Sequence, residues 1–216
     1  MSDPLRHLPD LVARLIAAFT AASQEPLPGQ HAHARMTPRL LDGTPPRPAA
    51  RERPAAVLVL LFPHDGAPHV VLTVRGAGLP HHADQISLPG GRPNTGETPE
   101  ATAVREAVEE IGVDPAIVEI LGRLTPVHIP VSGFTVQAIV GVAETRPAFV
   151  PAPGEVAEVL EVPLAVLGDP ANLRVGRRGR GGVEIDAPYF AVGDHQVWGA
   201  TAMILGELLA LAGWEP

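Results

Sequence analysis

The segment Gly90–Val113 constrains the fold more than any other part of the chain, because its second half carries the signals for both ends of a helix. Thr98 is a good N-cap residue, and Pro99 suits the first helical position. Gly112 is typical of the glycine that ends a helix. The sequence therefore predicts a helix that begins at Pro99 and closes at Gly112.

Three carboxylates share one face of this predicted helix. Glu106, Glu109 and Glu110 are spaced at i, i+3 and i+4, so their charges repel by roughly 0.2–0.5 kcal/mol per pair. A hard divalent cation would relieve this repulsion, because Mg²⁺ and Mn²⁺ prefer oxygen ligands. Arg105 can pair either with Glu109 on the next turn or with Glu97 before the helix. The alternative interpretation is an acidic helix face exposed to solvent.

The spacing of the whole segment resembles the Nudix box. That motif is Gly, five residues, Glu, seven residues, Arg-Glu, a small or aliphatic residue, any residue, Glu-Glu, any residue, Gly and an aliphatic residue. Its fixed positions are all filled here, by Gly91, Glu97, Arg105, Glu106, Ala107, Glu109, Glu110, Gly112 and Val113. The resemblance implies an α/β (α+β) protein with the Nudix fold, an α/β/α sandwich with a mixed β-sheet. It also implies a hydrolase in which divalent cations assist attack of water on a nucleoside diphosphate linked to another group.

The same resemblance implies a role for each matching residue. Glu106 and Glu110 are expected to bind Mg²⁺ or Mn²⁺, with the Gly91 carbonyl as a further oxygen ligand, and Glu109 is either a ligand or the base that activates water. Glu155 is the second candidate for the base. Three more residues are expected to support the site: Glu97, Arg105 and Gly112. A Nudix-fold binding protein without turnover remains the alternative of a different class.

Composition limits the classes of protein that are possible. The 216 residues, 45% hydrophobic and 19% charged, are enough for one globular domain with a substantial core. The net charge of −8 argues against general nucleic-acid binding, which needs a basic surface. The absence of cysteine excludes disulfides, thiolate metal sites and cysteine nucleophiles. No signal peptide or membrane-spanning run is recognisable, so we expect a cytoplasmic protein.

The chain divides into an N-terminal region, residues 1–54, and a Nudix domain, residues 55–216. Apolar spacing near 3.6 predicts an amphipathic helix over Pro4–Ser23, whereas the Pro-, Arg- and His-rich residues 25–54 predict an irregular arm with little helix or strand. His31 and His33 are interpreted as incidental residues of this arm rather than as a metal-binding pair. The N-terminal helix and an apolar helix over Trp198–Leu211 make a homodimer plausible.

Within the domain, apolar runs and turn signals predict most of the sheet. The expected strands are Ala55–Phe62, His69–Arg75, Ile117–Leu124, Phe134–Val142 and Glu155–Leu160, and the expected hairpin pairs Asn172–Val175 with Val183–Phe190. Val162–Leu167 is expected to form a short helical turn. The residues from Gly76 to Gly90 are expected to form a long loop that leads into the box.

This part of the chain resembles the coenzyme A pyrophosphatases among the Nudix enzymes. Their pattern begins here at Leu72–Arg75 and ends at Leu88–Gly91, in unbroken register. Four positions depart from it: Gly76 replaces Ser, Pro80 replaces Arg, Asp84 replaces Gly and Leu88 replaces Phe. The missing arginine removes a phosphate-binding group, for which His81 and His82 are possible substitutes.

The resemblance implies that coenzyme A or a derivative is cleaved to 3′,5′-ADP and 4′-phosphopantetheine. ADP-ribose, a dinucleotide or a nucleoside triphosphate remain alternative substrates. Candidates for binding the substrate phosphates are Arg75, Arg92 and a basic patch of Arg177, Arg178 and Arg180. Trp198 is interpreted as a core residue, with stacking on adenine as the alternative.

Overall fold

The computed structural model describes residues 5–22, 24–41, 52–76, 85–180 and 183–214. Its helices are α1 (Leu8–Ala21), α2 (Gly29–Met36), α3 (Pro99–Ile111), α4 (Leu164–Leu167) and α5 (Gly199–Leu211), with 3₁₀ turns η1 (Pro115–Ile117) and η2 (Pro170–Asn172). Its strands are β1 (Arg39–Leu40), β2 (Arg53–His64), β3 (Ala67–Arg75), β4 (Ile86–Ser87), β5 (Gly90–Gly91), β6 (Glu119–Arg123), β7 (Val127–Ile129), β8 (Phe134–Val142), β9 (Val156–Pro163), β10 (Leu173–Arg180), β11 (Val183–Val192) and β12 (His195–Trp198).

The larger sheet runs in the order β4-β3-β2-β8-β6, with β5 on β2, β7 on β8 and β9 on β3. Strands β2 and β8 are parallel, and the other pairs are antiparallel. A mixed sheet was expected, and this expectation is confirmed. A second, smaller sheet has the order β1-β11-β10, with β12 also paired to β11.

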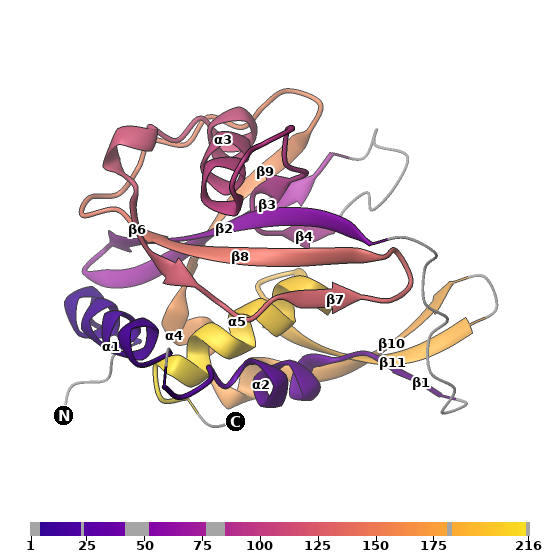
Figure 1. Cartoon of the computed structure of the whole chain (residues 1–216). Helices are drawn as coiled ribbons and strands as arrows, with labels where there is room; N and C mark the ends of the chain where they lie inside the picture. Colours follow the sequence, from indigo (N-terminus) through magenta and orange to yellow (C-terminus); the bar gives the residue numbers. More distant parts are fainter. Residues whose placement is uncertain (1–4, 23, 42–51, 77–84, 181–182, 215–216) are drawn as a thin grey trace.

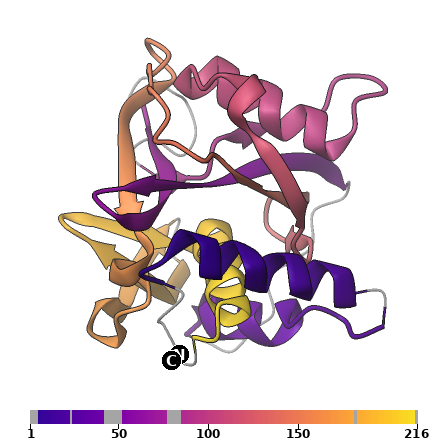
Figure 2. The ribbon, with the colours of Figure 1, turned by 90° about the vertical axis from the view of Figure 1, so that its left-hand side faces the viewer.

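The sheet is covered by helices on both faces, as Figures 1 and 2 show. Helix α3 packs on one face through Ala103, Ala107 and Ile111, which join a core with Leu58 and Phe62 of β2. On the other face lie α1, α2, α5 and the smaller sheet. This arrangement is the predicted α/β/α sandwich.

The hairpin of β2 and β3 follows the predicted pattern closely. Residues 58–62 of β2 and residues 68–74 of β3 are buried without a break, as expected of continuous apolar runs. Asp65 and Gly66, between the paired residues His64 and Ala67, both have positive φ angles, of 49° and 76°. This is the conformation that two-residue hairpin loops favour, and Asp-Gly is a preferred sequence for it.

The predicted ends of α3 are also confirmed. The Thr98 side chain accepts a hydrogen bond from the Ala101 amide, and Pro99 occupies the first turn. Gly112 has φ of 65°, and its amide donates to the Val108 carbonyl. The connection between β8 and β9 is held to the end of the helix, because the Val150 amide donates to the Ile111 carbonyl at 2.8 Å.

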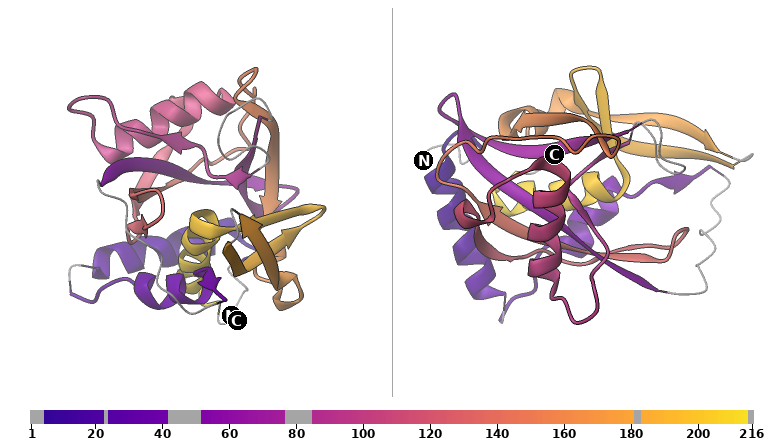
Figure 3. Two further views of the ribbon diagram at one scale, coloured as in Figure 1. Left: turned by 90° about the vertical axis from the view of Figure 1, so that its right-hand side faces the viewer. Right: turned by 90° about the horizontal axis from the view of Figure 1, so that it is seen from above.

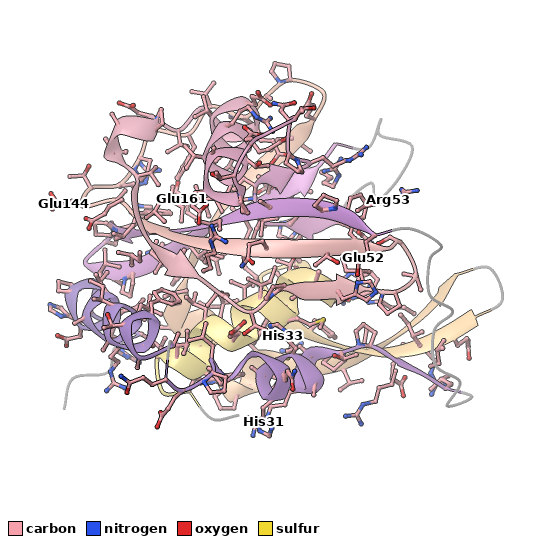
Figure 4. All side chains as sticks on the ribbon, viewed as in Figure 1. His31, His33, Glu52, Arg53, Glu144 and Glu161 are labelled. Atoms are coloured by element: carbon pink, nitrogen blue, oxygen red, sulfur yellow. The ribbon has the colours of Figure 1, made fainter. Side chains whose placement is uncertain are left out.

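The prediction of an irregular arm over residues 25–54 is wrong in one respect, because Gly29–Met36 form the helix α2. Its sequence has little apolar periodicity, so the helix depends on packing against α5. Ala32, His33 and Met36 are buried in that contact. Figure 4 shows His33 on the side of α5 and His31 on the opposite, exposed side of α2.

The apolar faces that suggested a homodimer are covered within the chain. Leu11 and Leu15 of α1 are fully buried in the main core, and most of α5 is buried in the same cluster. These faces therefore give no indication of a dimer. Among the described residues, no helix is long and apolar enough to cross a membrane.

Candidate active site

Arg105 is the centre of the polar network on α3. Its guanidinium group contacts three carboxylates: Nε lies 2.8 Å from Glu97, and Nη1 lies 2.9 Å from both Glu106 and Glu109. Nη2 donates to the Arg92 carbonyl at 3.0 Å. Both pairings considered for Arg105, with Glu109 and with Glu97, are present.

Glu97 is fixed as an anion in the loop before α3. Its carboxylate accepts hydrogen bonds from Arg105, from the Asn94 amide at 2.8 Å and from the Thr102 hydroxyl at 3.0 Å. These donors, Arg105 first, lower the pKa of Glu97 to about 2. Glu97 thus holds Arg105 in place, and Arg105 in turn orients the carboxylates of the helix.

Glu110 has the opposite environment, because its side chain faces the sheet. It is only 8% exposed, and it accepts a hydrogen bond from the Gly90 amide at 3.2 Å. Burial is the main cause that raises the pKa of Glu110 to about 7. The Gly90 amide and Arg75 oppose this rise, and the negative charges of Glu106 and Glu155 add to it.

Gly91 lies directly against the carboxylate of Glu106. A β-carbon at Gly91 would be 2.5 Å from the Glu106 Cδ atom, so another residue would displace the acid from this position. The short strand β5 pairs Gly90 and Gly91 with Val57 and Ala56 of β2 and holds this close approach. Gly91, the first glycine of the box, thus leaves the space that the Glu106 carboxylate occupies.

Glu155 comes to the site from the turn just before β9. The Gly76 amide donates to the Glu155 carbonyl at 2.9 Å, which joins this turn to the end of β3. Arg75 ends β3 on the same side, and its Nε is buried without a hydrogen-bond partner among the described residues. Both side chains act electrostatically on Glu110, so residues from three separate elements meet here.

The donor set suits a hard divalent cation. The carboxylate of Glu106 lies against Gly91 and that of Glu110 against the Gly90 amide, and their mutual repulsion is one cause of the raised pKa of Glu110. Among the described residues, no three acidic or histidine side chains already converge as a metal-binding group. Glu106 and Glu109 are paired with Arg105 instead, so metal binding requires these carboxylates to turn away from it.

The other predicted site residues have different outcomes. His81 and His82 lie outside the described residues. The side chain of Arg92 is exposed, and only its carbonyl is bonded to Arg105. Arg177 and Arg178 belong to β10 in the smaller sheet, away from α3.

Three residues that the sequence did not single out complete the network. Gly90 and Asn94 contribute backbone amides, and Thr102 contributes a hydroxyl group. Thr102 occupies a variable position of the box, so no motif marks it. For the contact of the Gly90 amide with Glu110, the sequence offered one signal, the pair Gly90-Gly91 at the start of the box.

Comparisons with known proteins agree on the family. The family model described as NUDIX domain matches residues 52–179. The chain is 38% identical over 185 residues to an uncharacterized Nudix hydrolase, NudL, of Klebsiella pneumoniae, covering 82% of this chain and 92% of that protein. It is 36% identical over 185 residues to the human mitochondrial coenzyme A diphosphatase NUDT8, covering 82% of this chain and 78% of that protein.

A solved structure of a Nudix hydrolase from M. smegmatis, RenU, is similar over 57% of this chain and 76% of its own, with 27% identity and a TM-score of 0.45. The family itself rests on the matched domain and the two relatives. With the box residues assembled on α3 as described, the chain belongs to the Nudix hydrolase family and is a pyrophosphohydrolase.

Proposed function

We propose that this enzyme hydrolyses coenzyme A or a derivative to 3′,5′-ADP and 4′-phosphopantetheine, with Mg²⁺ or Mn²⁺. The choice of coenzyme A as the substrate rests on the similarity to the human coenzyme A diphosphatase, which extends over 82% of the chain. The pattern before the box supports it, because Thr73 at its start pairs with Ser87, the residue before Leu88 at its end. Leu72–Arg75 end β3, and Gly90–Gly91 form β5.

Glu106 and Glu110, with the Gly91 carbonyl, would hold the metal. When bound, a divalent cation neutralises diphosphate charge and lowers the pKa of a coordinated water. Arg75 brings a positive charge to the same place, because it acts on Glu110 electrostatically, and a guanidinium group suits the binding of a phosphate oxygen through its terminal nitrogens. In the reaction, water adds to one phosphorus atom, the bridging P–O bond breaks, and a carboxylate takes the proton of the water.

The structure suggests a different order for the two candidate bases. Glu109 was the first choice, but its carboxylate is held by Arg105 at 2.9 Å. Glu155 lies next to the buried Glu110, and no ion pair is found for it among the described residues. We therefore propose Glu155 as the base and Glu109 as the second candidate.

The test is product analysis by chromatography, with coenzyme A, ADP-ribose, NADH and a deoxynucleoside triphosphate offered separately with Mg²⁺ and with Mn²⁺. We expect a strong preference for coenzyme A, with release of 3′,5′-ADP. Preference for another of these compounds would overturn the substrate and keep the reaction class. Glu110→Gln should lose metal-dependent turnover and stay folded, and full turnover in this variant would refute the metal assignment.

A further inference from the structure

The smaller sheet has one face in the core and one face that carries aromatic and basic side chains. Phe190 and Val197 are paired across β11 and β12, and both are fully buried. Because side chains alternate along a strand, the neighbouring pair Tyr189 and Trp198 lies on the opposite face. Both rings are half-buried there.

Arg178 of β10 lies on this face between the two rings. Its guanidinium carbon is 4.5 Å from the centroid of the Trp198 ring and 5.9 Å from that of Tyr189. Gly176, two residues earlier, leaves space for the Tyr189 ring, since a β-carbon there would lie 3.1 Å from it. The guanidinium group thus makes cation–π contacts with both rings, the closer one with Trp198, and such contacts are made by arginine more often than by lysine.

The charge of Arg178 has no carboxylate partner among the described residues. Nη2 donates to the side-chain oxygen Oε1 of the exposed Gln196 at 2.5 Å. Nε is buried without a hydrogen-bond partner among the described residues. By contrast, Arg105, Arg123 and Arg146 each pair with glutamate. A half-buried guanidinium with only a neutral, exposed partner is suited to bind an anion at its terminal nitrogens.

This face connects to the candidate active site through β4. Strand β12 lies beside β4, and the Thr201 hydroxyl at the start of α5 donates to the Ile86 carbonyl at 3.2 Å. Ile86 pairs with Val74, and the amide of the next residue, Arg75, donates to the Gln85 carbonyl. Figures 1 and 3 show the β10–β11 hairpin extending outward at one end of the molecule.

We propose that Arg178, held by Trp198 and Tyr189, determines specificity by binding a phosphate monoester that the substrate carries apart from its diphosphate. This inference rests on the proposed function, because coenzyme A carries such a group at its ribose 3′ position. A long substrate could then be held at two places, with its diphosphate at α3 and its monoester at the smaller sheet. The enzyme as a whole is acidic, so this local positive charge also attracts a polyanion.

The test compares coenzyme A with dephospho-coenzyme A, which lacks only the 3′-phosphate, in the wild type, Arg178→Gln and Arg177→Gln. Arg177 is the matched control, because it is the next residue, points to the other face and lies 3.6 Å from Asp186. For Arg178→Gln we expect KM for coenzyme A to rise about tenfold or more, with kcat little changed, and KM for dephospho-coenzyme A to stay the same. Arg177→Gln should behave as the wild type.

An equal loss toward both substrates, or no loss toward either, would overturn the assignment. If the wild type hydrolyses neither compound, the proposed function fails. The phosphate site at Arg178 is then tested separately, by measuring the binding of nucleotides. Calorimetry in the presence of a metal chelator would then compare the affinity for adenosine 3′,5′-bisphosphate with that for 5′-AMP. Tighter binding of the bisphosphate that is lost in Arg178→Gln supports the phosphate site, and equal binding of the two nucleotides refutes it.

Discussion

The imidazole Nε2 of His33 lies 2.9 Å from the carboxylate of Glu207, although 174 residues separate the two in the chain. Glu207 is fully buried in α5 and also accepts hydrogen bonds from Thr125, from its amide at 3.1 Å and its hydroxyl at 2.7 Å. One buried acid therefore joins α2, α5 and the segment after β6. A buried carboxyl group is tolerated there because hydrogen bonds from His33 and Thr125 satisfy its oxygens.

Replacing this acid should destabilise the fold. Glu207→Leu would leave polar groups of the buried His33 and the half-buried Thr125 without this partner, and we expect the free energy of unfolding to fall by about 3 kcal/mol. Urea denaturation measures the change. Glu144→Gln, at the exposed acid labelled in Figure 4, is the control and should change stability by less than about 0.5 kcal/mol. A similarly small effect at Glu207 would mean that the network contributes little.

A small residue is required where α2 meets Thr125. A β-carbon at Gly29 would collide with the Thr125 side chain, which is itself bonded to Glu207. Although alanine usually favours a helix over glycine, Gly29→Ala should therefore lower stability, by roughly 1–3 kcal/mol. Gly179→Ala is the control, because a β-carbon there meets nothing within 4 Å. Thermal unfolding of the two variants gives the comparison, and a stabilised Gly29→Ala would contradict this packing.

The buried carboxyl of Glu110 predicts a pH dependence of stability without metal. Its pKa is about 7 in the folded protein and near 4.5 when unperturbed, so folding takes up a proton between these values. Stability should therefore fall as pH rises from about 4.5 to 7, by roughly 3 kcal/mol at most. Melting temperatures in the presence of a chelator test this against Glu110→Gln, whose profile should be flatter. Identical profiles would show that Glu110 is not the group responsible.

The several contacts of the Arg105 guanidinium group predict that lysine cannot replace this residue. Lysine has one charged nitrogen, whereas Arg105 contacts Glu97, Glu106, Glu109 and the Arg92 carbonyl through three. We expect Arg105→Lys to lower kcat about 10- to 100-fold, as loss of a supporting contact does at metal sites. The exposed pair of Arg123 with Glu100 offers a control, Arg123→Lys, which should keep full activity. Steady-state kinetics at saturating metal measures kcat for both variants. Equal kcat values for Arg105→Lys and Arg123→Lys would contradict this prediction.

The two candidate bases make different predictions. Removal of a general base lowers kcat by roughly 100-fold or more and removes its limb from the pH–rate profile. We expect this result for Glu155→Gln, and a smaller loss with an unchanged profile for Glu109→Gln. The reverse order would return the role of base to Glu109.

Local signals in the sequence predicted the helix of the box and the first hairpin well. Thr98, Pro99 and Gly112 each act within a few residues, and so does the Asp65-Gly66 turn. The contact of Arg105 with Glu97 was also within reach, because both belong to one motif. Spacing along a helix and the chemistry of turns were sufficient for these features.

Features that depend on distant partners could not be predicted in this way. Helix α2 forms against α5, and nothing near His33 in the sequence indicates that it meets Glu207. The stacking of Arg178 on Trp198 requires three strands in register, whereas the sequence indicated only a basic hairpin. The raised pKa of Glu110 likewise depends on Gly90 and the turn at Glu155 closing around it.

The position of Glu207 also determines the order in which the protein can be completed during synthesis. The ribosome makes α5 after every element that this carboxylate joins, so His33 and Thr125 have no shared partner until the last helix has been made. The part of this sheet face that α5 covers therefore stays open until α5 has been made, and closing it brings the early α2 together with the later α5.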